Sequence, residues 1–148
     1  SYSRSGEAVE RYLAEYPDLA VVIDLHRDAL GDGDVVYKTV AHEGSSPAAQ
    51  VLLLVGTGEN GLYHPYWREN LKLALHLQQS IVARYPTLAR PVALKQERYN
   101  QQLTSGSLLL ELGSSGNTLP EALEAVRLFA ECAGPVLLSL VSYEDAEG

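Results

Sequence analysis

The sequence predicts an α/β fold: a single three-layer domain with a mostly parallel, mixed sheet and helices on both faces. One observation is a repeated order of helix, connection and strand. The connection Tyr-Pro-x-Leu-Ala occurs twice, at Tyr16–Ala20 and Tyr85–Ala89. Another is that unbroken apolar runs, such as Val21–Ile23 and Gln50–Gly56, are typical of strands covered on both faces. Two helix-to-strand units with matching connections indicate parallel strands in a layered sheet.

The individual elements follow from apolar periodicity and turn residues. They are expected, in chain order, as a helix at 6–16, a strand at 21–25, a turn at 31–34 with a hairpin strand at 35–41, a buried strand at 50–56, a helix at 66–84, strands at 90–94 and 107–113, a helix from 118 and a final edge strand within 135–143. The helix at 66–84 is the clearest, because Leu73, Leu77 and Ile81 form one apolar face. Thr118 and Glu121 have the spacing of a capping box, which starts the last helix.

Composition narrows the possible functions. The 148 residues are most simply one domain, 1–148, with enough chain to bury a core. A formal charge of −8 argues against nucleic acid or anionic lipid as a partner, since phosphate binding needs clustered Lys and Arg. No apolar run approaches the ~20 residues of a membrane span. Cys132 is the only cysteine, so any metal must be held by His, Asp or Glu.

Two ionisable side chains come at the ends of predicted strands. His26 follows the strand at 21–25, and Glu111 lies near the end of the strand at 107–113. In parallel α/β sheets, sites gather at the carboxyl ends of the strands, and a buried carboxylate is unfavourable unless it is paired, ligated or protonated. Both residues are therefore candidates for chemistry. The alternative is that both extend into solvent beyond the edge of the sheet.

A third candidate is Glu69, which lies four residues before Leu73 and is therefore expected on the sheet-facing side of its helix. The alternative is that an acid here only complements the helix dipole. A catalytic zinc needs three protein ligands, an open position for water and a carboxylate base. His26 and Glu69 as ligands, with Glu111 as base, would supply all but one of these parts. His64, in the aromatic loop before the helix, either caps the helix or lines a cleft, and Trp67 suits sugar stacking or packing.

Several blocks in fixed order resemble a known family. The segments "DLHRDA" (24–29), "HPYWRENLKLALHL" (64–77) and "YPTLARPVALKQERYNQQLTSGSLLLELGSSGNTLPEAL" (85–123) are together similar to the catalytic domain of the stage II sporulation protein P family. These proteins are zinc-dependent cell-wall hydrolases related to the N-acetylmuramoyl-L-alanine amidases. Blocks that match over nearly the whole chain are more specific than a single motif.

The resemblance implies an amidase-like fold and specific roles. The family cleaves the amide between N-acetylmuramic acid and L-alanine and is also associated with cleavage of peptide cross-bridges. His26 and Glu69 correspond to Zn²⁺ ligands and Glu111 to the catalytic carboxylate. The residues Asp24, Arg27 and Asn100 match the surrounding pattern. Arg27 is expected to help hold the oxyanion. Asp24 and Asn100 are expected to support the ligands or contact the substrate, and the same is expected of His64 and Trp67.

One position departs from the family pattern. The pattern is expected to have histidine as third ligand in "YNQHL", whereas this chain has Gln102. Gln102 can offer only an amide oxygen, and zinc prefers imidazole or carboxylate. Three alternatives stay open: another side chain such as His64 takes its place, the residue is a substitution that silences the enzyme, or the chain is a degenerate member.

The resemblance also implies a setting: a fragment of a longer, membrane-anchored protein on the extracytoplasmic, wall-facing side of the membrane. The expected partners are peptidoglycan, a lytic transglycosylase and membrane proteins of the engulfment machinery. Two alternatives stay open. One is a catalytically impaired or inactive module that binds peptidoglycan or a partner, which Gln102 favours. The other is a zinc peptidase that acts on free peptides.

Overall fold

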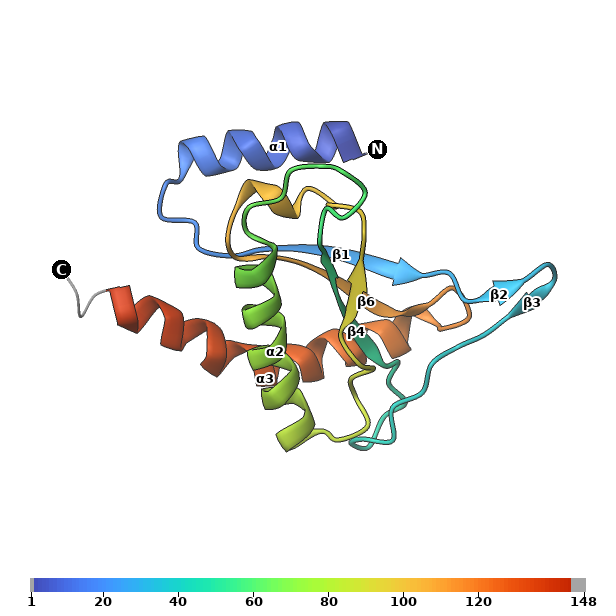
Figure 1. Ribbon diagram of the computed structural model, residues 1–148. Coiled ribbons are helices and arrows are strands. Elements are labelled where there is room, and N and C mark those ends of the chain that lie inside the picture. Colours follow the sequence, from blue (N-terminus) through green and yellow to red (C-terminus); the bar gives the residue numbers. More distant parts are fainter. Residues whose placement is uncertain (1, 145–148) are drawn as a thin grey trace.

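The computed structural model describes residues 2–144, and the side chains of 2–140 (Figure 1). Helices flank a central sheet, as the sequence predicts. The elements are α1 (Tyr2–Glu15), β1 (Val22–Asp28), β2 (Gly31–Asp32), β3 (Val35–Val36), β4 (Val51–Gly56), α2 (Trp67–Arg84), β5 (Ala93–Lys95), the short 3₁₀ helix η1 (Gln101–Leu103), β6 (Ser107–Ser114) and α3 (Leu119–Glu144).

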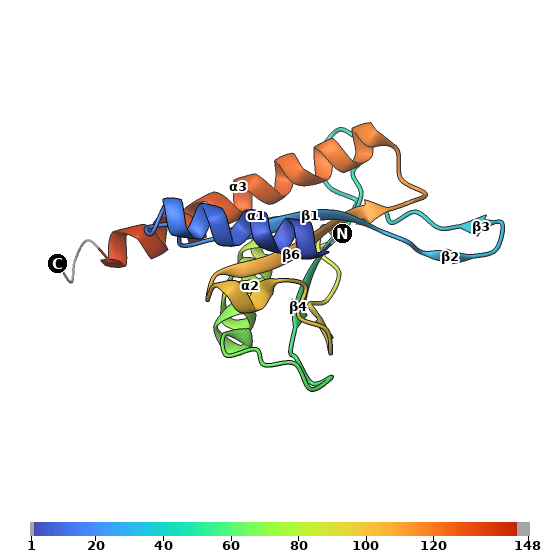
Figure 2. The same cartoon turned by 90° about the horizontal axis from the view of Figure 1, so that it is seen from above.

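The central sheet is mixed, with the strand order β1-β6-β4-β5. β1 runs parallel to β6, and β4 runs parallel to β5, but β4 and β6 are antiparallel. The carboxyl ends of β1 and β6 therefore lie at one edge of the sheet, and those of β4 and β5 lie at the opposite edge. The small β2–β3 hairpin projects away from the body in both views (Figures 1 and 2).

One face of the sheet carries the hydrophobic core, which α2 and α3 cover. Alternate residues of a strand point to opposite faces, so Leu53 of β4 and Leu108 and Leu110 of β6 contribute to this side. The buried core residues are Ala41, Ala48, Ala49, Val51, Leu53, Val55, Leu73, Ala74, Leu77, Ile81, Leu88, Leu108, Leu110, Ala125, Leu128, Phe129, Cys132 and Ala133. Removal of this apolar area from water is the main source of stability.

The other face of the sheet is covered by α1 and the loop before η1. The intervening residues of the strands point to this side, among them Asp24, His26, Leu109 and Glu111. Figure 1 shows α1 running along the sheet on the side away from α2 and α3. Helices on both faces confirm the predicted layers.

Two of the strand predictions are wrong. The expected strand at 35–41 is reduced to the two residues of β3, and residues 135–143 continue α3 instead of forming an edge strand. Pro135 suggests a break, because it lacks an N–H and clashes with the preceding turn. The helix continues because Val136 and Leu137 beyond it pack against the core. Ser80 Oγ also donates a hydrogen bond to Cys132 O, near the site of the lost helical bond (2.9 Å).

The predicted start of α3 is confirmed in detail. Glu121 Oε2 accepts a hydrogen bond from Thr118 N at 2.8 Å, and Glu121 N donates to Thr118 Oγ1 at 3.3 Å. This is the reciprocal pattern of a capping box. Among the described residues, no helix is both long and apolar enough to cross a membrane.

Candidate functional site

His26 and Glu111 lie side by side on neighbouring strands. In the parallel pairing of β1 with β6, His26 is the register partner of Glu111, and both are on the face covered by α1. Asp24 lies two residues earlier in β1, on the same face, and its Oδ2 is 2.9 Å from His26 Nε2. We call these three residues the His26–Glu111 site. The sequence predicted this pairing from the carboxyl ends of two strands, and the structure brings the two residues together.

Partial burial sets the acidity of Glu111. The pKa of Glu111 is raised, first by burial and then by the nearby Asp28 carboxylate, while His26 and Arg90 oppose the shift. Arg90 is itself paired with Asp28 at 2.8 Å. Glu111 Oε2 is buried and has no hydrogen-bond partner among the described residues. A carboxylate with a raised pKa and an unsatisfied oxygen is suited to accept a proton from a reacting group.

Two tyrosines that the sequence did not single out lie over this site. The ring of Tyr2 is stacked on that of His26, with centroids 6.3 Å apart and an angle of 7° between the planes. Tyr99 meets the edge of Tyr2 at 5.8 Å. Burial, then Asp24 and Glu111, raises the pKa of Tyr2, and burial, then Glu97, raises that of Tyr99 to about 12. Both phenols therefore stay protonated. No local motif marks Tyr2, because it reaches the site only through the packing of α1.

Arg27 follows His26 in β1, where the register with β6 shifts between His26 and Asp28. Its guanidinium donates hydrogen bonds to Ser114 O (2.9 Å) and to Asn117 O. These contacts fix the turn between β6 and α3. The role expected for Arg27, to help hold an oxyanion, stays a prediction; in this arrangement its guanidinium is bonded to the turn after β6.

Glu69 is not near the His26–Glu111 site. Its residue neighbour Asn70 donates to Gln101 O (2.9 Å) and accepts from Ser107 N (3.0 Å), which places this turn of α2 at the start of β6. Glu111 is four residues further along β6, about 13 Å at the usual rise per residue. The expectation that Glu69 faces the sheet is also wrong, since its side chain is exposed. The reason is the antiparallel orientation of β4, which starts α2 at the opposite edge.

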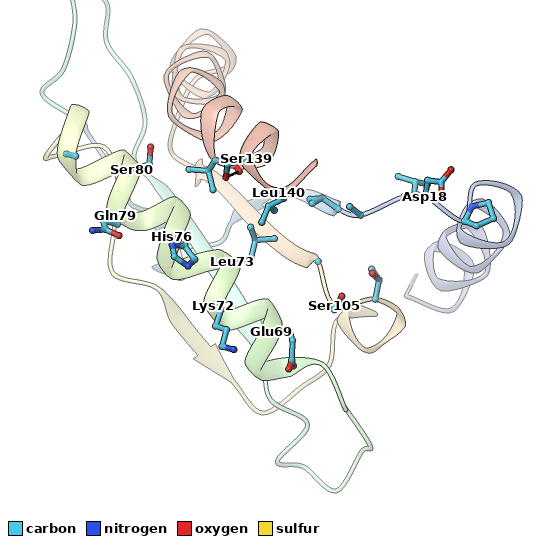
Figure 3. A pocket seen from close by; sticks show the side chains of 18 residues that line it. Asp18, Glu69, Lys72, Leu73, His76, Gln79, Ser80, Ser105, Ser139 and Leu140 are labelled. Carbon is cyan, nitrogen blue, oxygen red and sulfur yellow. Dashed lines mark hydrogen bonds between the residues drawn. The ribbon is translucent and has the colours of Figure 1, made fainter. Parts of the chain in front are cut away.

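Glu69 instead lines a cavity of about 970 Å³. The cavity lies between α2, the last turns of α3 and the segment before β1 (Figure 3). Lys72, His76 and Gln79 line it from the same helix, and Asp18 and Ser139 line it from the other two segments. Its position at the amino ends of β1 and β6 separates it from the His26–Glu111 site.

His64 and Trp67 belong to the edge at which β4 ends. His64 is only 6% exposed, and neither ring nitrogen has a hydrogen-bond partner within the described residues. Burial, then the charge of Arg98, lowers the pKa of His64, so its imidazole stays neutral. Trp67 begins α2, and the Arg68 guanidinium lies over its ring at 4.6 Å. Neither residue is brought to His26 and Glu111.

Comparison with known proteins identifies the family. The chain matches the family described as Stage II sporulation protein P (SpoIIP) over residues 1–133. The chain belongs to this family. It is 33% identical to Stage II sporulation protein P of Bacillus subtilis (strain 168) over 136 residues, which cover 88% of this chain and 32% of that protein. The chain thus spans about a third of this relative. No solved structure matches it.

The segment in which this SpoIIP domain departs from the expected pattern is well packed. Gln101 crosses to β4, where its Oε1 accepts from Gly56 N (2.8 Å) and its Nε2 donates to Leu54 O (2.9 Å). Asn100 has a left-handed backbone (φ 61°) and donates to Tyr2 O at 2.8 Å. Gln102 is half-buried, and its Oε1 lacks a hydrogen-bond partner in the part of the chain described. Asn100 therefore holds α1, whereas the Gln102 amide oxygen is unsatisfied.

The donor side chains complete a zinc site only in part. Glu111 Oε2 and Gln102 Oε1 are each buried acceptors without a partner among the described residues, a state that a cation or a donor would relieve. His26 supplies one imidazole. However, the side chains of residues 2–140 include no group of three His, Cys, Asp or Glu placed to hold one metal ion. A catalytic zinc needs three protein ligands, and this arrangement brings together only part of such a set, so the steps below are assigned to the chain's own groups.

Proposed function

We propose that this SpoIIP domain is a peptidoglycan hydrolase that cleaves the amide between N-acetylmuramic acid and L-alanine. The observation that carries the proposal is the pairing of His26 with Glu111, whose carboxylate is partly buried and unsatisfied beside a polar strand end. Membership of a sporulation family supports a role in remodelling the wall during spore formation. Cleavage of peptide cross-bridges belongs to the same proposal.

Each residue of the site has a separate task in amide hydrolysis. Glu111 takes a proton from water while the water oxygen bonds to the scissile carbonyl carbon. It then passes the proton to the leaving nitrogen as the carbon–nitrogen bond breaks. Asp24 fixes the orientation of the His26 ring through the contact at Nε2. The proposal includes zinc dependence: a zinc ion bound at His26 would supply a water of lowered pKa and polarise the carbonyl.

The setting of the activity is also proposed. The domain would act on the wall-facing side of the membrane, held there by a part of the protein outside this chain. A net charge of −8 gives no electrostatic attraction to an anionic wall polymer. Recruitment by partners, such as a lytic transglycosylase and membrane proteins of the engulfment machinery, therefore fits this chain better than binding by charge.

A second candidate function is a non-catalytic module that binds peptidoglycan or a protein partner. The observation in its favour is the incomplete set of metal ligands, with Gln102 where histidine is expected in the family. The fold and the loops around the site would then serve recognition alone. A zinc peptidase for free peptides would need the same missing ligand, and nothing in the geometry favours it over an enzyme of the wall.

Digestion of purified peptidoglycan distinguishes these functions. The hydrolase is expected to release new L-alanine amino groups in the presence of zinc, and Glu111→Gln is expected to abolish their release while leaving the fold intact. Gln102→His is the informative companion variant, because an added imidazole should raise the affinity for zinc. The hydrolase proposal fails if neither the original chain nor the Gln102→His variant forms these end groups, and binding to peptidoglycan without cleavage would establish the second candidate.

A further inference from the structure

We propose that the trough between Tyr99, Asn100 and β1 is the groove in which the saccharide and first peptide residues of the wall polymer bind, and that α1 is a displaceable lid over it. This inference rests on the proposed function, because it assigns the substrate groove of the same site. It adds a surface that is covered in the structure, together with the helix that covers it.

The first observation is that α1 closes the site with its own first residue. Tyr2 stacks on the His26 ring and contacts Tyr99, so a side chain of the lid lies over part of the imidazole, whose side chain stays 35% exposed. The Tyr2 phenol also lies within electrostatic reach of Asp24 and Glu111, the carboxylates on which the chemistry depends. A substrate that approaches His26 and Glu111 from this face must therefore displace Tyr2.

The second observation is a set of hydrogen bonds from Asn100, here called the clasp, that helps to hold the lid. Asn100 Nδ2 donates to Tyr2 O at 2.8 Å and to Ser5 Oγ at 3.1 Å. Gly6 is the one buried residue of α1, and a Cβ built there would lie 3.1 Å from Asn100 Oδ1. Tyr99 and Asn100 both have left-handed backbones (φ 53° and 61°), which are unfavourable for residues other than glycine. The clasp is thus specific, but it is built on strained backbone.

The third observation is a gap beneath the helix. A cavity of about 130 Å³ lies between α1 and the sheet. Its lining residues are Ser5, Val9, Val22, Ile23, Asp24, Tyr99, Asn100, Gln101, Ser107 and Leu108. Protein interiors that stay closed are packed to near-crystalline density, with few voids larger than a water molecule. An interface with such a gap loses few contacts when it opens, in keeping with a helix that moves.

The chemistry of the trough indicates what replaces α1. Its open side would present the Tyr99 ring, the Asn100 amide and Asp24 next to Glu111. An aromatic face with a few polar groups is the usual composition of a small-molecule or sugar site. A muramoyl ring over Tyr99 would place its lactyl amide toward His26 and Glu111, and the hydroxyls of the sugar would take the hydrogen bonds that Asn100 now gives to α1.

The lid can be opened without loss of helix-forming tendency. Gly6→Leu should push α1 from Asn100, while leucine favours a helix more than glycine does. Ala14→Leu is the matched control, because Ala14 is on the same helix but exposed. The lid can also be locked: Gly6→Cys with Asn100→Cys should form a disulfide when oxidised, and Cys132 is too buried (2% exposed) to compete.

The opening of the lid is tested first by the NMR signals of the His26 ring, identified by their absence in His26→Gln. Stacked aromatic rings shift each other's resonances. The chemical shifts of the His26 ring in Gly6→Leu and in the reduced double-cysteine protein should therefore differ from those in the oxidised double-cysteine protein. Those in Ala14→Leu should match the shifts of the original chain. Identical His26 signals in Gly6→Leu and Ala14→Leu would overturn the lid.

The groove is tested with a soluble muramoyl-peptide fragment as probe. Its affinity is expected to be at least tenfold lower for the oxidised double-cysteine protein than after reduction, and highest for Gly6→Leu. Equal affinity in the locked and released forms would overturn the groove. Release of L-alanine end groups from intact wall, measured in parallel, separates the proposals. Cleavage that is indifferent to the lock contradicts the groove alone, whereas lock-dependent binding without cleavage in any form supports the groove and contradicts the hydrolase.

Discussion

The two edges of the sheet differ in what they offer to a ligand. At the carboxyl ends of β1 and β6, His26 and Glu111 are neighbours under a covering helix, and one carboxylate oxygen is unsatisfied. At the opposite edge, Glu69 and Lys72 line a cavity of about 970 Å³. The large cavity combines exposed charges with open space, whereas the small site combines desolvation with paired ionisable groups. The large cavity and the residues suited to catalysis therefore lie at opposite ends of the strands.

The strongest test of this difference is a pair of identical substitutions. Glu111→Gln is expected to lower the rate of wall hydrolysis by about 10²- to 10⁴-fold, since a general base is lost. Glu69→Gln, which makes the same chemical change at the other edge, is expected to alter the rate by less than about threefold, well below what loss of a metal ligand or general base would give. Release of L-alanine end groups measures both. A large loss in Glu69→Gln would show that the two edges act together and would return Glu69 to the ligand set.

The second prediction concerns the turn that holds the end of β6. Gly113 has φ 69°, and an added Cβ would lie 2.6 Å from both Ala49 Cβ and Asn117 Oδ1. Gly113→Ala is expected to lower the free energy of unfolding by about 3 kcal/mol, because strain and overlap add. Gly33→Ala is the control, since Gly33 has φ 58° but no atom within 4 Å of its added Cβ. That variant should lose only about 1 kcal/mol in urea unfolding. Equal losses of unfolding free energy in the two variants would mean that the residues around Gly113 move aside to accommodate the added methyl group.

A smaller effect is expected at the carboxylate that orients His26. Asp24→Asn should lower the rate of wall hydrolysis by about 10- to 100-fold, because the ring loses its charged partner at 2.9 Å. Asp18→Asn supplies the comparison, because Asp18 lines the large cavity at the other edge. If both variants kept full activity, the Asp24 contact would have no part in the reaction.

The smallest effect is a dependence of stability on pH at the start of α3. Lys38, then Thr118 N and Asn117, hold the pKa of Glu121 at about 2, well below its usual 4.5. Because the pKa is lower in the folded state, the charged carboxylate stabilises the fold above pH 4.5, and this contribution is lost as the pH falls to about 2. Thermal unfolding of Glu121→Gln should therefore depend less on pH in this window. An unchanged slope would show that Glu121 contributes nothing there.

The sequence was sufficient for the features that depend on local pattern. The strand ends that carry His26 and Glu111 were predicted because an unbroken apolar run followed by a polar residue marks the end of a buried parallel strand. The start of α3 was predicted because the capping box has a fixed spacing. In both cases the signal lies within a few residues and depends on no other part of the chain.

Features that depend on distant packing were not predicted. The run Val51–Gly56 is buried along its whole length, so its pattern is the same whichever way the strand runs, and the reversal of β4 could not be seen. This reversal places the start of α2, and with it Glu69, at the edge away from His26 and Glu111. Tyr2 was missed because its position depends on how α1 docks on Asn100, a contact between residues 98 positions apart.

The position of Trp67 has a consequence for spectroscopy. Trp67 is the only tryptophan of the chain and begins α2, close to the edge at which β4 ends. Its intrinsic fluorescence therefore reports on the surroundings of the start of α2 and is expected to change little when a ligand binds beside His26. A titration that leaves this emission unchanged would not count as absence of binding, whereas a tryptophan introduced in place of Tyr99 would give the His26–Glu111 site an optical signal of its own.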